Sequence, residues 1–195
     1  MELAHTVPEP RADISAKLLA ANARLLERLG FADGIAHSEW RIAPDGRTVL
    51  MEIAARTPGD GLMALYYLAT GVPMEPEILN IALSAPASYP APRRYARQVY
   101  LEHQPGVLDD VTLSWPDVQP HWIGEGGVWP EIKPGPADDD SALRAVFVLK
   151  NRGSALGPLE SSDDRAVTFF IDAPEPEQLD PLEQRVRAAI TIKTR

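Results

Sequence analysis

The amino-acid sequence predicts an α+β fold in two parts, an antiparallel sheet with flanking helices over residues 1–92 and a small β-rich lobe over residues 93–195. Three observations support this prediction. A turn sequence joins two strand-like runs in the first part, and helical periodicity occurs on both sides of these runs. An Ala/Pro/Ser-rich stretch at residues 85–92, typical of a linker, then precedes a region of short β-like runs.

The first part begins with a short predicted strand at residues 3–7, which Pro8 ends because proline has no backbone N–H to donate. An amphipathic helix follows over about residues 13–29, where leucines recur at helical spacing. We expect Asp13 to be its N-cap, and Gly30 to end it.

A β-hairpin is the clearest predicted element, with strands at residues 34–42 and 47–55. The turn Ala-Pro-Asp-Gly between them contains a glycine that can adopt a positive φ. A loop containing Arg56 and Gly59 follows the hairpin. Two helices, at about residues 61–69 and 75–84, complete this part.

The second part contains short strand-like runs separated by irregular segments. These runs are residues 95–102, 107–114, 145–150 and 166–172. The Pro/Gly/Trp-rich acidic stretch at residues 116–141 is predicted to form loops and an irregular hairpin. A helix near residues 176–189 leads to an expected edge strand at residues 191–193.

Composition excludes several classes of function. The net charge of -9 argues against a nucleic-acid or anionic-membrane partner, because both attract dense Lys and Arg patches. The sequence has no cysteine, so any metal must be bound by oxygen or imidazole. No apolar run approaches the roughly 18 residues that cross a bilayer, and the N-terminus does not resemble a signal peptide. We therefore expect a cytoplasmic protein.

Glu39 and Glu52 are the candidate metal ligands, because the hairpin places them on neighbouring strands roughly opposite each other. Adjacent carboxylates repel, and a divalent cation between them removes that cost. Magnesium suits such a site, since it takes part of its shell from one or two carboxylates and the rest from water and phosphates. The pattern alone leaves an alternative open, in which both glutamates are solvated and Arg56 is a surface cation that pairs with Asp60.

Other candidate residues point to structure more than to chemistry. His37 is expected to be a packed strand residue. The tryptophans at positions 40, 115, 122 and 129 are expected to form an aromatic cluster in the core or between the two parts, and Asp138–Asp140 are expected to lie in a solvated loop.

Two segments of the sequence resemble a known family. The segment LGFADGIAHSEWR at residues 29–41 and the segment VLMEIAARTPGD at residues 49–60 are similar to the C-terminal subdomain of ATP-grasp ligases, with the L-amino-acid ligase group closest. The resemblance covers residues 13–84 best and extends more weakly to the C-terminus. It implies an ATP-grasp C-terminal subdomain followed by a small β-rich lobe.

The resemblance also implies roles for individual residues. Glu39 matches the first metal carboxylate of the family and Glu52 the second. Arg56 matches an arginine that contacts the transferring phosphate and the acyl phosphate, and Gly59 matches a loop glycine whose amide meets the substrate. Asp60 could meet the incoming amine or cap the following helix. Many family members have an asparagine ligand where this sequence has Ala54.

The activity implied is ATP-dependent joining of a carboxylate to an amine through an acyl phosphate, with Mg²⁺ or Mn²⁺. We expect this chain to be the catalytic half of such a ligase, because the lobes and lid lysines that hold ATP in the family have no counterpart here. No lysine lies between Lys17 and Lys133. A separate chain with the N-terminal and lid regions, or a homo-oligomer, would then complete the enzyme. A non-catalytic binding or scaffold protein and a fragment of a longer ligase are the alternatives.

Overall fold

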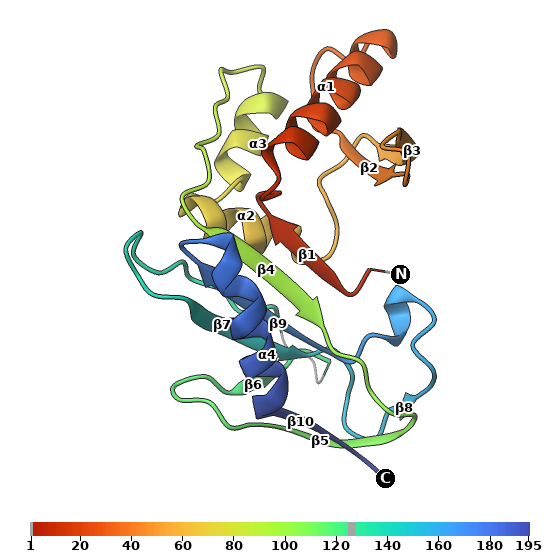
Figure 1. The fold of residues 1–195 in the computed structure, drawn as a ribbon, viewed down its shortest axis with the longest axis vertical. Coiled ribbons are helices and arrows are strands. Elements are labelled where there is room, and N and C mark those ends of the chain that lie inside the picture. The colour runs from red at the N-terminus through yellow and green to blue at the C-terminus, as the bar shows by residue number, and fades with distance from the viewer. Residues whose placement is uncertain (1, 125–127) are drawn as a thin grey trace.

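The computed structural model describes residues 2–124 and 128–195 and has the predicted α+β class, with antiparallel pairing in all three sheets and helices on their flanks (Figure 1). The main sheet has five strands in the order β1 (Ala4–Val7), β4 (Tyr95–Tyr100), β9 (Val167–Ala173), β7 (Ala142–Val148) and β6 (Pro120–Trp122). All neighbours are antiparallel except β6 and β7, which are parallel.

Strand β9 lies in the middle of this sheet, and all seven of its residues are buried. Its alternate side chains enter two hydrophobic clusters, as the two-residue period of a strand requires. Phe169 and Ile171 belong to one cluster with helix α4 (Leu179–Ala189), whereas Phe170 belongs to the other with helix α2 (Leu62–Thr70). The two helices therefore contribute to cores on opposite faces of the sheet.

The remaining elements form two smaller sheets and two more helices. A three-stranded sheet has the order β10 (Ile190–Thr194), β5 (Gly106–Leu113) and β8 (Ala155–Leu156). The hairpin of β2 (His37–Ile42) and β3 (Thr48–Ala54) stands beside helix α1 (Ala12–Arg28), at the upper right of Figure 1. Helix α3 (Glu75–Ala82) follows α2, and short 3-10 turns occur at η1 (Ser162–Asp164) and η2 (Pro176–Gln178).

Two polar contacts join the hairpin to α1. Ser38 donates to the Asn22 side chain at 2.9 Å, and the Lys17 ammonium donates to the Gly46 carbonyl at the hairpin turn. Gly46 adopts a φ of 80°, so the turn has the positive φ that its glycine predicted.

Several local predictions were wrong. Arg11 and not Asp13 is the N-cap of α1, and Asp13 lies in its first turn. The stretch at residues 116–141 contains β6, which pairs in parallel with β7, so this pairing is no hairpin. Residues 125–127 of that stretch lie outside the described residues. The acidic segment Asp138–Asp140 is a loop with Asp138 and Asp140 exposed, as predicted, and it is also anchored to the sheet, because Asp139 pairs with Arg144 at 2.7 Å and its carbonyl accepts a hydrogen bond from the buried Arg94.

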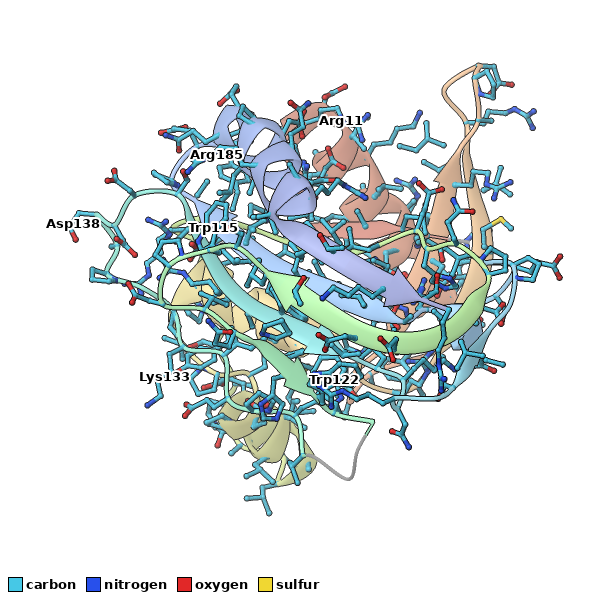
Figure 2. All side chains as sticks on the ribbon, turned by 90° about the horizontal axis from the view of Figure 1, so that it is seen from below. Arg11, Trp115, Trp122, Lys133, Asp138 and Arg185 are labelled. Carbon is cyan, nitrogen blue, oxygen red and sulfur yellow. The ribbon has the colours of Figure 1, made fainter. Side chains whose placement is uncertain are left out.

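The four tryptophans do not form one cluster. Trp115 and Trp122 border the core on the α4 side, where the guanidinium carbons of Arg185 and Arg152 lie 5.2 and 3.7 Å from their ring centroids (Figure 2). Trp129 contacts Phe147 and Phe170 at centroid distances of 5.0 and 6.3 Å, towards the α2 side of the sheet. Trp40 lies in the hairpin and donates to Ser38.

The division at residues 92 and 93 stays a prediction. Strand β1 from the first part pairs with β4 from the second, and α2 contacts both β4 and β9. Within the described part of the chain, no helix is long and apolar enough to cross a membrane.

Candidate functional site

A cleft of about 850 Å³ lies where the hairpin, the start of α1, β1 and the loop between β3 and α2 approach one another. The candidate residues Glu39, Arg56 and Gly59 line it, together with Asp60 and His5. Apolar side chains from α1 and the hairpin, including Ile14, Leu18 and Met51, also line it. The cleft thus combines charged groups from several elements with an apolar lining, a combination typical of small-molecule sites.

Glu39 and Glu52 are direct cross-strand partners in the register of the hairpin. Directly opposite residues in an antiparallel pair have Cα atoms roughly 4.5–5.5 Å apart. The register shifts between Glu39 and Trp40, so Met51 is an extra residue on β3 next to this pair. The register confirms the prediction that the two glutamates lie opposite each other, and their role as metal ligands stays a prediction.

The two glutamates lie at the surface of the protein. Their side chains are 49% and 54% exposed, so they are accessible to an ion and its waters. His37 Nε2 lies 3.4 Å from Glu39. No group of three or more acidic or histidine side chains that could hold a metal occurs within residues 2–124 and 128–195. Two carboxylates suit Mg²⁺, which takes its other ligands from water and phosphate.

Arg56 follows β3 and points back towards Glu52. Its Nη2 lies 3.6 Å from the Glu52 carboxylate, and its Nη1 donates to the Thr57 carbonyl at 2.9 Å. The alternative in which Arg56 pairs with Asp60 is wrong, since Asp60 binds other groups. Arg56 is 48% exposed, so its guanidinium is accessible from the cleft that it lines.

Asp60 is held by residues from distant parts of the chain. His5 Nε2 lies 2.9 Å from its carboxylate, and Arg165 Nη1 donates to both carboxylate oxygens at 3.1 and 3.2 Å. Burial acts to raise the pKa of Asp60, but the hydrogen bond from His5 and the charge of Arg165 outweigh it, so this pKa lies below its ordinary value. Asp60 does not cap α2, because Gly61 is the N-cap there.

Gly61 anchors the other end of this loop to the main sheet. Its N–H donates to the Gln98 side-chain oxygen at 3.0 Å. A Cβ at this position would lie 2.5 Å from Phe170 and 2.6 Å from Gln98, too close for any side chain without a shift of these groups. The close approach explains why glycine occupies the position.

Sequence reasoning missed the Arg165 and His5 contacts with Asp60. Arg165 lies 105 residues from Asp60, and His5 lies 55 residues from it. No local pattern links such positions, because the contacts arise only when β1, β4 and β9 assemble in one sheet. The sequence did indicate Asp60 as a candidate. Its predicted roles as helix cap and as partner of Arg56 are replaced by other contacts, and its role towards the incoming amine stays a prediction.

Comparisons with known proteins identify the fold. No protein-family model matches the sequence, and no curated protein matches it. An L-amino acid ligase from Bacillus licheniformis superposes with a TM-score of 0.73 and 16% identity, covering 100% of this chain and 44% of that one. A phosphoribosylglycinamide synthetase from Anaerococcus prevotii gives a TM-score of 0.72 and 15% identity, covering 99% and 45%.

A third match is the N5-carboxyaminoimidazole ribonucleotide synthetase from Thermotoga maritima, with a TM-score of 0.60, 14% identity and coverage of 98% and 46%. The chain therefore has an ATP-grasp-like fold, as the sequence resemblance implied. It spans less than half the length of these solved chains.

Proposed function

We propose that this chain supplies the metal- and phosphate-binding part of an ATP-dependent ligase that joins a carboxylate to an amine. One observation carries the proposal: Glu39 and Glu52 are direct cross-strand partners, and Arg56 lies 3.6 Å from Glu52. Two carboxylates beside an arginine form the combination that binds a cation together with a phosphate. The ATP-grasp-like fold supports the proposal, since it occurs in enzymes of this kind.

Glu39 and Glu52 would hold Mg²⁺ or Mn²⁺, which would neutralise charge on the phosphates of ATP. Arg56 binds oxygens of the transferring phosphoryl group through its planar donors, and its hydrogen bond to Thr57 fixes the direction of its guanidinium. Gly59 offers its N–H to a substrate oxygen. Phosphoryl transfer requires mainly positioning and charge neutralisation, so these roles suffice for this part of the enzyme.

The reaction proceeds in two steps. A substrate carboxylate oxygen attacks the γ-phosphorus of ATP, the bond to ADP breaks, and an acyl phosphate forms. The amine then attacks the acyl carbon, loses a proton, and displaces inorganic phosphate to leave an amide or peptide bond. The site that binds adenine would come from a separate chain with the N-terminal and lid regions, or from a second copy. We place this biosynthetic assembly in the cytoplasm.

The test measures ADP release at micromolar ATP by the purified full chain, alone and with the product of an adjacent reading frame that carries a lysine-bearing lid. Mixed amino acids serve as carboxylate and amine. We expect no release from the chain alone, and release in the mixture that requires both substrates. Turnover by the chain alone would contradict the half-enzyme proposal.

Variants separate the ligase from a non-catalytic binding protein. Arg56→Ala should abolish ADP release by the mixture while the two chains still associate. Arg152→Ala, which removes an arginine near Trp122 and outside the cleft lining, serves as the control and should leave release unchanged. Association without any ADP release, under all substrate combinations, would favour the scaffold alternative.

A further inference from the structure

We infer that Asp60 is a positioning residue, which with His5 and Arg165 fixes the segment of residues 56–61 so that Arg56 and Gly59 face the cleft. The inference rests on the proposed function, because that function assigns a phosphate to Arg56. Asp60 itself contacts neither of these two residues through its carboxylate, which binds His5 and Arg165 and also interacts with the Tyr100 hydroxyl.

The backbone at Asp60 adopts a left-handed conformation, which aspartate and asparagine visit more readily than other residues besides glycine. Its φ is 52°, in the left-handed region that costs energy for residues other than glycine. Three polar contacts within 3.2 Å hold the carboxylate in place, one to His5 and two to Arg165. Loss of the carboxylate should therefore release the segment to other conformations.

Arg165 can act as a fixed anchor because the protein surrounds it. Its side chain is 4% exposed, and its Nη2 donates to the Glu2 carbonyl at 2.7 Å. Its guanidinium carbon lies 3.9 Å from the centroid of the Tyr100 ring on β4. The guanidinium thus connects Asp60 to the main sheet and to Glu2, which lies two positions before β1.

Gly61, the next residue of the segment, is connected to Tyr100 through Gln98. The Tyr100 hydroxyl accepts a hydrogen bond from Gln98 Nε2 at 2.9 Å, and Gln98 Oε1 accepts one from the Gly61 N–H at 3.0 Å. Asp60 and Gly61 are therefore each bound to groups that contact Tyr100. This arrangement fixes the end of the segment in both position and direction.

Asp60, at the fixed end of the segment, lies close in sequence to Gly59 and Arg56, the residues that would bind substrate and phosphate. Pro58, whose φ is restricted by its ring, separates Thr57 from Gly59. The Thr57 carbonyl accepts the hydrogen bond that orients Arg56. A shift at Asp60 would consequently move the Gly59 amide directly and the Arg56 guanidinium through Thr57.

Two measurements on the full chain test the inference. The first is amide hydrogen exchange in residues 56–61, and the second is calorimetric binding of tripolyphosphate in the presence of Mn²⁺. Asp60→Gly removes the carboxylate but tolerates the positive φ, so the fold should persist. We expect faster exchange in this segment and at least about tenfold weaker binding, because binding must then order the released segment again.

Glu9→Gln is the matched control. Glu9 also lines the cleft and pairs with an arginine, Arg11, at 2.7 Å, but it lies outside the segment of residues 56–61. The control should change binding less than about twofold, as expected for the loss of an exposed ion pair. An equal effect of both variants would show that only the charge of the cleft matters, and would overturn the inference.

Arg165→Lys provides the second variant. Lysine keeps the positive charge but lacks the planar fork that reaches Asp60 and the Glu2 carbonyl together. It should reproduce the faster exchange and weaker binding of Asp60→Gly. If both variants leave exchange and binding unchanged, the inference is wrong. If Asp60→Gly fails to fold, Asp60→Asn, which also tolerates a positive φ, decides by the same two measurements.

The two proposals fail in different ways. If the unmodified chain does not bind Mn²⁺ with tripolyphosphate, the proposed function is contradicted. Faster exchange at residues 56–61 in Asp60→Gly and Arg165→Lys would still support the positioning role. Normal exchange in both variants, together with tight binding of Mn²⁺ and tripolyphosphate by the unmodified chain, would contradict the positioning role and support the proposed function.

Discussion

At the scale of single residues, the proposed metal site depends on the register that pairs Glu39, which lines the cleft, with Glu52, which is not among the residues lining it. A slip of one residue would turn one of the two side chains to the other face of the hairpin. The bulge at Met51 lies beside this pair and separates two registers of the hairpin. Residues 37–39 pair with 52–54 on one side of the bulge, and residues 40–42 pair with 48–50 on the other. The pair therefore depends on the whole hairpin.

Divalent ions should stabilise the chain if this pair binds them. At a metal concentration 100 times the Kd, binding to the folded state adds about 2.7 kcal/mol to the free energy of unfolding. We expect Mn²⁺ to raise the Tm, and either Glu39→Gln or Glu52→Gln to abolish the rise. The measurement is thermal unfolding with and without Mn²⁺.

Glu75→Gln, in the first turn of α3, is the control for this measurement, because its carboxylate lies outside the hairpin. It should keep the full response to Mn²⁺. An identical rise in Tm for the wild type and for both hairpin variants would place the ion elsewhere.

Asp60 should make the stability of the protein sensitive to acid. Its pKa is lowered in the folded state, so its contribution is present above the unfolded value of about 3.9 and is lost as the pH falls through the lower folded value. Urea unfolding at a series of pH values should show Asp60→Asn less stable than the wild type at pH 7. The difference should shrink as the pH falls below about 4. A constant difference would show that the carboxylate charge plays no part.

At the scale of elements, the contact between the start of α2 and the main sheet allows one sharp test. Gly61→Ala would place a Cβ 2.5 Å from Phe170, at the core of the sheet. We expect a loss of about 1–3 kcal/mol in the free energy of unfolding, as for other overpacked positions. Urea unfolding measures it. Gly157→Ala, where nothing lies within 4 Å of the added Cβ, is the control and should change little.

The elements that the sequence predicted are those with local signals. The turn at residues 43–46 predicted the hairpin, leucine spacing predicted α1, and the hairpin in turn placed Glu39 opposite Glu52. The pairing of β1 with β4 joins residues 89 to 95 positions apart and has no local signal. For the same reason the anchor of Asp60 on Arg165 could not be predicted, although the loop around Asp60 could.

At the scale of the whole molecule, the hairpin leaves strand edges and apolar side chains uncovered. Strands β2 and β3 pair only with each other among the described residues, which leaves two strand edges unpaired. Ile42, Val49, Leu50 and Met51 on this hairpin are 36–55% exposed. Unpaired edges beside exposed apolar side chains favour association.

We therefore expect the working form of the protein to be an assembly that covers the hairpin. Sedimentation should show a species larger than the monomer, either for the chain alone or after a candidate partner is added. Val49→Lys should weaken the assembly. Thr191→Lys, on the distant strand β10, should leave it unchanged. A strict monomer under both conditions would contradict this expectation.

The central place of β9 has a consequence for synthesis on the ribosome. Its residues, 167–173, follow β4 and β7 in the sequence, yet both hydrophobic clusters include its side chains. Until β9 emerges, the nascent chain holds β4 and β7 without the strand that joins them, and the apolar sides of α2 and both strands lack their partner. The sheet can therefore be completed only after β9 has been synthesised, and until then the β4 edge is open to chaperones or to wrong strands.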